Sequence, residues 1–146
     1  MNKKTRKKLR SEDIIRKAGF RATKPRVSIL SFLQTSKYPL TIKEIGERLE
    51  NRTVDQVTIY RILDAFKKAG IVNQIDFQDN SARYEYKDGE RDHHHLICLD
   101  CRKVTDIAGC DYKKLSENVL KQAPDFAKVT AHSFEFFGMC NNCDRK

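Results

Sequence analysis

Apolar positions in the first part of the chain recur at the three-to-four-residue spacing of amphipathic helices. This periodicity predicts four successive helices, over residues 11–18, 24–33, 42–49 and 54–69. Gly70 follows the last of them, at a position where glycine commonly ends a helix. The first part of the chain is therefore expected to be mainly helical.

Three of these helices begin with residues that are suited to capping. Ser11 and Thr23 are predicted N-caps, and Pro25 lies in the first turn, where its missing N–H does no harm. Thr41 with Glu44 three residues later predicts a capping box.

Two short runs with strand-forming residues follow, over 71–75 and 82–86, around the polar sequence Asp79-Asn80-Ser81. They predict a β-hairpin. Helices followed by a hairpin have the order of a winged helix-turn-helix domain, with the recognition helix at 54–69.

The rest of the chain predicts a smaller α/β domain after a polar hinge at residues 88–92. Strands are expected over 93–98, 103–107 and 127–137, with a helix from its N-cap Asp111 to Gln122. Apolar residues of this helix are expected to face inward: Leu115, Val119 and Leu120. The predicted fold class is α+β, with a winged helix-turn-helix domain over 11–87 and a small α/β domain over 93–146.

Positive charge is concentrated in the first domain. Residues 1–87 contain 20 Lys and Arg against 10 Asp and Glu, whereas residues 88–146 contain 9 against 10. A basic arm over residues 1–10 carries six of these charges: Lys3, Lys4, Arg6, Lys7, Lys8 and Arg10. A basic domain joined to a near-neutral one is typical of nucleic-acid-binding proteins. For the arm alone, a solvated tail without a partner is the alternative.

The sequence argues against a membrane protein and against an enzyme. No stretch approaches the roughly 18 apolar residues of a membrane span, and no apolar segment follows the basic start as in a signal peptide. We therefore expect a cytoplasmic protein whose thiols stay reduced. There is no His-x-Glu followed by Pro-Cys-x-x-Cys, no Gly-rich phosphate loop and no activated serine motif.

Two Cys-x-x-Cys pairs, Cys98/Cys101 and Cys140/Cys143, each follow a predicted strand. This spacing lets both thiolates of a pair reach one tetrahedral ion, so the sequence predicts a structural Zn²⁺ site with four cysteine ligands. A thioredoxin-like redox pair is the alternative, but one pair would suffice for it and no βαβ pattern surrounds either pair. A closed site of this kind leaves no coordination position for catalysis.

The histidines and the fifth cysteine all lie in the second domain. His93 and His95 are expected on one face of a strand and His94 on the other, so metal sites on both faces are possible. Surface histidines without a metal are the alternative. Cys110 is expected to be a small hydrophobic residue near a helix start, with a redox role or metal ligation left open.

The run Asp92-His-His-His-Leu-Ile-Cys-Leu-Asp-Cys101 resembles the central signature of the ferric uptake regulator (Fur) superfamily. The stretches Val-Thr-Ile-Tyr-Arg-Ile-Leu at 57–63 and Ala-Gly-Ile-Val at 69–72 resemble its recognition helix and following turn. Thr-Lys-Pro-Arg at 23–26 resembles its early helix start, and together these matches span about residues 12–143. The resemblance implies a winged-helix domain, a hinge and an α/β dimerisation domain. It also implies a homodimer that binds AT-rich inverted repeats in double-stranded DNA when a regulatory metal is bound.

The resemblance implies DNA-contacting residues on the recognition helix and before the second helix. Tyr60 corresponds to a base contact and Arg61 to a phosphate contact, with Thr58 on the same helix. Arg21 and the basic arm are expected to enter the minor groove. The alternative for Tyr60 is packing in the core.

The resemblance also implies two further metal sites. The regulatory hinge site maps to Glu85, His93, His95 and Asp106, and a second site maps to Asp92, His94, Asp111 and His132. The sequence departs from the family twice. Tyr38-Pro39-Leu40 stands where the family often supplies a histidine from the DNA-binding domain, and Lys113 stands where a helix carboxylate is usual. The regulator metal is left open among Fe²⁺, Zn²⁺, Mn²⁺ and Ni²⁺.

The resulting hypothesis is a metal-dependent transcriptional repressor of metal homeostasis genes. Metal bound between Glu85 and the histidines His93 and His95 would fix the angle between the domains, so that two recognition helices match successive major grooves. Two alternatives stay open. One is a peroxide sensor in which a ligand histidine is oxidised, and the other is a DNA-binding protein whose zinc is structural only.

Overall fold

The computed structural model describes residues 10–49, 54–87 and 93–145, so most of the predicted basic arm and all of the predicted hinge lie outside it. The chain divides into two compact units, unit 1 (Met1–Lys87) and unit 2 (Asp88–Lys146), and each is described by itself. Among the described residues, none of the helices has the length and apolarity that crossing a membrane requires.

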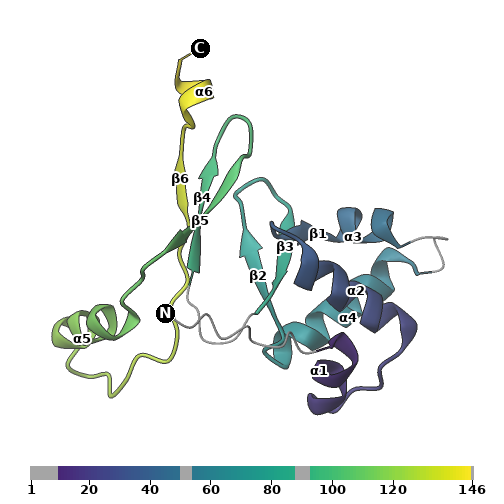
Figure 1. Ribbon diagram of the computed structural model, residues 1–146. Coiled ribbons are helices and arrows are strands. Elements are labelled where there is room, and N and C mark those ends of the chain that lie inside the picture. The colour runs from purple at the N-terminus through teal and green to yellow at the C-terminus, as the bar shows by residue number, and fades with distance from the viewer. Residues whose placement is uncertain (1–9, 50–53, 88–92, 146) are drawn as a thin grey trace, which may run out of the picture. The chain divides into compact units, whose positions relative to one another are not determined.

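Unit 1 consists of helices next to one small sheet (Figure 1). Its elements are α1 (Ser11–Lys17), α2 (Lys24–Thr35), β1 (Leu40–Thr41), α3 (Ile42–Arg48), α4 (Gln56–Lys68), β2 (Val72–Asp76) and β3 (Ala82–Tyr86). The strands are antiparallel in the order β1-β3-β2. This is the predicted winged helix-turn-helix fold, with the two-residue strand β1 as an addition that the sequence pattern did not indicate.

The core of unit 1 fixes the orientation of α4. Its residues Ile59, Leu63 and Phe66 are fully buried in one cluster that also includes Tyr84 of β3. Burying each large apolar side chain contributes about 1.5–3 kcal/mol. Because these residues share one face of the helix, the opposite face of α4 points to solvent.

The helix starts agree only in part with the capping signals. Thr41 and Glu44 form the predicted capping box at α3. Thr23 lies at the N-cap position of α2 but makes no side-chain capping bond. The prediction for Ser11 is wrong: Arg10 is the N-cap of α1, and Ser11 is a buried first-turn residue whose hydroxyl donates to Gln34 Oε1 at 2.6 Å.

Unit 2 is built on a three-stranded sheet. Its elements are β4 (His93–Cys98), β5 (Val104–Ala108), α5 (Tyr112–Gln122), β6 (Phe136–Gly138) and α6 (Asn141–Asp144). Strand β4 is central, antiparallel to β5 and parallel to β6. Figure 1 shows α5 beyond one end of this sheet and α6 at the other.

Two predictions for unit 2 are corrected. The third strand covers only Phe136–Gly138 and not 127–137, because β6 pairs with β4 only at Leu96–Cys98. Helix α5 has no buried residue, and Leu115 and Val119, which were expected to face inward, are 38% and 44% exposed. Ile97 is the one aliphatic side chain that is buried in the described part of unit 2, so a single copy of this unit has almost no apolar core.

Candidate metal centres and nucleic-acid interface

The two Cys-x-x-Cys pairs come together at the α6 end of unit 2. Cys98 and Cys101 lie where β4 turns into β5, and the turn is closed by the Cys98 amide, which donates to the Lys103 carbonyl at 2.9 Å. Cys140 is the N-cap residue of α6, and Cys143 is buried within that helix. The Cys140 amide donates to Cys98 Sγ at 3.4 Å and joins the two segments.

The cluster has the dimensions of a tetrahedral zinc site. Cys101 Sγ and Cys140 Sγ are 3.7 Å apart, and all four Sγ atoms lie within 4.8 Å of one another. Around tetrahedral zinc, a Zn–S distance of about 2.3 Å places neighbouring sulfurs about 3.8 Å apart. The donor set and its spacing therefore fit zinc.

Backbone amides stabilise negative charge on two of these thiols. The hydrogen bond from the Cys140 amide is the main reason that the pKa of Cys98 falls to about 6. The Cys143 amide lowers the pKa of Cys140, whereas the pKa of Cys143 is raised, first by its hydrogen bond with the Asp100 side chain. A dication at the centre would stabilise all four thiolates.

A second group of donors lies on one face of β4. His95 is 1% exposed, and Glu135 Oε2 accepts from its backbone amide at 2.8 Å and contacts its Nδ1 at 3.1 Å. Asp106 is the β5 partner of His95 in the sheet, and its Oδ1 lies 3.7 Å from His95 Nε2. The His93 ring packs edge-on against the His95 ring, with centroids 5.1 Å apart.

Glu135 determines which nitrogen of His95 is available as a ligand. An ionised carboxylate only accepts, so Nδ1 is the nitrogen that donates to Glu135, and Nε2 is the nitrogen that lies toward Asp106 Oδ1. A metal ion would therefore bind His95 through Nε2. A carboxylate behind a ligand histidine is also the usual support of a metal site.

For two of the residues assigned to metal sites, Glu85 and Asp92, the structure does not test the assignment. Glu85 lies on β3 of unit 1 opposite Asn73, whose side-chain amide donates to Glu85 Oε1 at 3.4 Å. Its participation in a hinge site stays a prediction. Asp92 lies outside the described residues.

The opposite face of β4 carries a third group of donors, formed by His94, Cys110 and His132. Nε2 of His132 lies 3.1 Å from His94 Nε2 and 3.6 Å from Cys110 Sγ. Asp111 instead caps α5, where its Oδ1 accepts from the Lys114 amide at 3.0 Å. Cys110 lies near the start of α5, as expected, and its sulfur faces the imidazole of His132.

Helix α4 presents polar and aromatic side chains to solvent. Tyr60 is 53% exposed, which excludes the alternative that it packs in the core, and Arg61 beside it is exposed. Thr58 is half-buried, and its amide donates to the N-cap residue Asp55 at 2.7 Å. This hydrogen bond is the main reason that the pKa of Asp55 is lowered.

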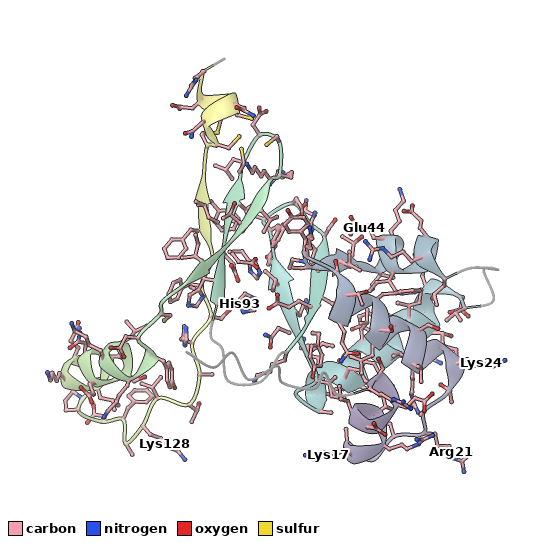
Figure 2. The ribbon with its side chains drawn as sticks, viewed as in Figure 1. Lys17, Arg21, Lys24, Glu44, His93 and Lys128 are labelled. Atoms are coloured by element: carbon pink, nitrogen blue, oxygen red, sulfur yellow. The ribbon has the colours of Figure 1, made fainter. Side chains whose placement is uncertain are left out.

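Arg21 lies in the connection between α1 and α2. Figure 2 shows it together with Lys17 and Lys24 at this end of unit 1. All three side chains are exposed, so they add positive charge to the unit that presents Tyr60 and Arg61.

Glu135 is the site residue that sequence reasoning missed, and for Cys110 the sequence had left metal ligation open. Glu135 stands between Phe134 and Phe136 in the sequence, just before β6. Its contact with His95 spans 40 positions of sequence and has no local signal. Cys110 was recognised as the odd cysteine, but its neighbour His132 is 22 positions away.

Comparison with known proteins places this geometry in a family. Residues 17–137 match the Ferric uptake regulator family. The peroxide-responsive repressor PerR of Staphylococcus aureus (strain Mu50) is 34% identical over 136 residues, which are 90% of this chain and 88% of that protein. PerR of strain USA300 matches with the same identity and coverage.

Solved structures agree. The ferric uptake regulator of Francisella tularensis with iron has a TM-score of 0.71 and 27% identity, over 86% of this chain and 96% of that one. The Helicobacter pylori regulator Fur, described with three functional metal binding sites, has a TM-score of 0.72 and 27% identity, over 91% and 88%. Members of this family are transcription regulators and not enzymes, as the motif analysis predicted. The chain therefore belongs to the ferric uptake regulator family of metal-responsive transcription regulators.

Proposed function

We propose that this chain is a metal-dependent DNA-binding repressor that acts as a homodimer on AT-rich inverted repeats. The observation that carries the proposal is the exposed face of α4, on which Tyr60 and Arg61 point away from a well-packed core. In this arrangement Tyr60 contacts base edges through thymine methyl groups, Arg61 contacts phosphate, and Thr58 and Arg21 add contacts at the helix start and the α1–α2 connection.

The exposed apolar surface of unit 2 supports the homodimer. Large apolar side chains that would be buried in a stable domain are exposed in a single copy: Leu96, Leu99, Leu115, Val119, Phe126, Phe134, Phe136 and Met139. Exposed apolar side chains in this number are typical of an interaction surface. Two-fold pairing of unit 2 covers the same apolar side chains on both copies and provides two copies of α4 for two half-sites.

The metal dependence is assigned to two sites with different roles. Cys98, Cys101, Cys140 and Cys143 hold a permanent structural zinc, which has no open position. His93, His95 and Asp106, with Glu85 from unit 1, hold the exchangeable regulator, which is Fe²⁺, Zn²⁺, Mn²⁺ or Ni²⁺. When bound, the regulator supplies a positive charge that neutralises the facing carboxylates and selects one arrangement of the two units.

Replacing Tyr60 with alanine tests the role of α4 in reading DNA. Tyr60→Ala is expected to weaken binding to a selected operator by about tenfold or more, because an apolar base contact is lost. Tyr38→Ala is the matched control, since Tyr38 is also 53% exposed but lies outside α4. Fluorescence anisotropy measures both. Equal affinities of the two variants would rule out the assignment.

Replacing Arg61 with alanine has a different expected signature. A phosphate contact carries no sequence information, so Arg61→Ala lowers affinity for operator and unrelated DNA alike and reduces the slope of log K against log salt by about one. The exposed Arg145 of unit 2 provides the control variant Arg145→Ala. A change in sequence preference without a change in slope would contradict a phosphate contact.

A second candidate function, peroxide-responsive repression, is favoured by the 34% identity to the repressor PerR of Staphylococcus aureus. In that case, incubation with Fe²⁺ and hydrogen peroxide adds an oxygen atom to His93 or His95 and releases the DNA. Peptide mass spectrometry locates the added oxygen. If the protein is unmodified and still binds DNA after this treatment, peroxide sensing is excluded and metal sensing remains as the function.

A further inference from the structure

Three donor side chains from separate segments of unit 2 converge near the start of α5. His94 comes from β4, Cys110 from the connection between β5 and α5, and His132 from the segment before β6. One ligand atom of each lies within 4.8 Å of the other two. All three side chains are buried or half-buried.

The distances match those around a single tetrahedral ion. With Zn–N about 2.0 Å and Zn–S about 2.3 Å, tetrahedral geometry places two nitrogens about 3.3 Å apart and a nitrogen and a sulfur about 3.5 Å apart. His94 Nε2 and His132 Nε2 are separated by 3.1 Å, and His132 Nε2 and Cys110 Sγ by 3.6 Å.

The surroundings orient both rings toward this point. His94 Nδ1 lies 3.0 Å from the Phe134 carbonyl, which only accepts, so Nδ1 carries the proton and Nε2 presents a lone pair. The His94 ring stacks on Phe134 with centroids 4.0 Å apart. His132 stacks on Tyr112 with centroids 5.1 Å apart, and the Tyr112 hydroxyl donates to the Val129 carbonyl at 2.9 Å. A backbone carbonyl behind a ligand histidine and packing around the ring are features of a built metal site.

We propose that His94, Cys110 and His132 bind a thiophilic divalent cation, with Cys110 as a thiolate ligand. This set differs from the carboxylate-containing set that the family resemblance implied, because Asp111 is used as the cap of α5. A thiolate with two imidazoles favours zinc-like ions over manganese or magnesium, which prefer oxygen ligands. Three protein ligands leave one coordination position for water or an anion.

The site links α5 to the sheet. No residue of α5 is buried, and Cys110 lies two positions before its first residue. Coordination joins this point to β4 and to the segment before β6, which restrains the helix that carries exposed Leu115 and Val119. The proposal concerns unit 2 alone, so it stands or falls independently of DNA binding.

Titration with Co²⁺ tests the site in full-length protein that holds one zinc per chain in its four-cysteine cluster. The predicted hinge ligands include no thiol, so a thiolate-to-cobalt charge-transfer band that develops while the zinc stays bound reports on Cys110. Cys110→Ser is expected to lose this band and to weaken Co²⁺ binding at the site by at least about tenfold. The control Glu85→Gln alters the predicted hinge site and is expected to keep the band.

Each possible outcome either supports or overturns Cys110 as a thiolate ligand. A band in wild type and in Glu85→Gln that is missing in Cys110→Ser, with unchanged zinc content and circular dichroism, supports the thiolate ligand. No band in wild type, or the same band in Cys110→Ser, overturns it. Co²⁺ is also expected to slow amide hydrogen exchange in α5 of wild type but not of Cys110→Ser. Unchanged exchange in wild type overturns the link between the site and the helix.

Discussion

Replacing Cys98 with serine is expected to release the structural zinc, unfold unit 2 and abolish the dimer, while unit 1 stays folded. Cys98 is 4% exposed, ends β4 and receives the Cys140 amide at 3.4 Å, so its loss breaks the cluster at the point where two segments meet. In a small metal-stabilised domain, the free energy of metal binding is folding free energy. Unit 2 depends on it strongly because Ile97 is its one buried aliphatic side chain among the described residues.

Zinc content, sedimentation velocity and circular dichroism measure this effect together. Cys110→Ser is the matched control, since it makes the same chemical change in the same unit but outside the four-cysteine cluster, and it is expected to keep the zinc of that cluster and the dimer. The core of unit 1 is composed entirely of its own residues, so its helical signal should persist in Cys98→Ser. A zinc-free Cys98→Ser protein that is fully folded and dimeric would overturn the structural role of the cluster.

Local signals made unit 1 predictable from the sequence. Its helices carry apolar residues at helical spacing, and the capping box of Thr41 and Glu44 lies within four positions of sequence. Its core is large enough that the apolar face of each helix is the buried face, as with Ile59, Leu63 and Phe66 of α4. In unit 1 the apolar spacing in the sequence therefore agrees with the burial of the side chains in the structure.

Unit 2 was harder to predict from the sequence, because the spacing of its apolar residues does not correspond to burial within one chain. Leu115 and Val119 have the spacing of a buried helix face but are exposed, which is expected if a second copy covers them. The expected strand at 127–137 was too long, because the aromatic residues before β6 pack on histidines, as Phe134 does on His94. Contacts of this kind depend on tertiary structure and leave no periodic signal.

The residues of the candidate sites also differ in how far they could be predicted from the sequence. The four-cysteine cluster was evident because each pair has its ligand spacing in the sequence, whereas Asp106 was assigned to the site of His93 and His95 only through the family resemblance. In the structure, Asp106 is the β5 partner of His95. Glu135 and Cys110 reach their histidines across 40 and 22 positions, which no local motif records. The sequence therefore indicated candidate ligands, and the structure adds the contacts of Glu135 and Cys110 with the histidines.

Replacing His95 with asparagine is expected to abolish the increase in DNA affinity that the regulatory metal produces. The asparagine amide nitrogen can take the place of Nδ1 and still donate to Glu135, but the variant has no atom at the position of Nε2, the nitrogen that faces Asp106 at 3.7 Å. The backbone hydrogen bond from residue 95 to Glu135, 2.8 Å in length, is kept, so the fold is little changed. Anisotropy titrations with Mn²⁺ at a fixed operator concentration measure the effect. The variant is expected to bind DNA as weakly with metal as wild type does without it.

Glu135→Gln gives a graded version of the same test. It removes the negative charge that holds the proton on His95 Nδ1 but leaves every metal ligand in place, so the Mn²⁺ concentration at half-maximal DNA binding is expected to rise by about 10–100-fold while the plateau is unchanged. Glu117→Gln, on the exposed side of α5, makes the same chemical change away from the site and is expected to have no effect.

If wild type binds DNA equally with and without Mn²⁺, Fe²⁺, Zn²⁺ and Ni²⁺, the protein is a constitutive DNA-binding protein and its zinc is structural only. If His95→Asn responds to Mn²⁺ like wild type, the regulatory metal binds elsewhere, and the orientation of His95 by Glu135 serves the fold of unit 2 alone.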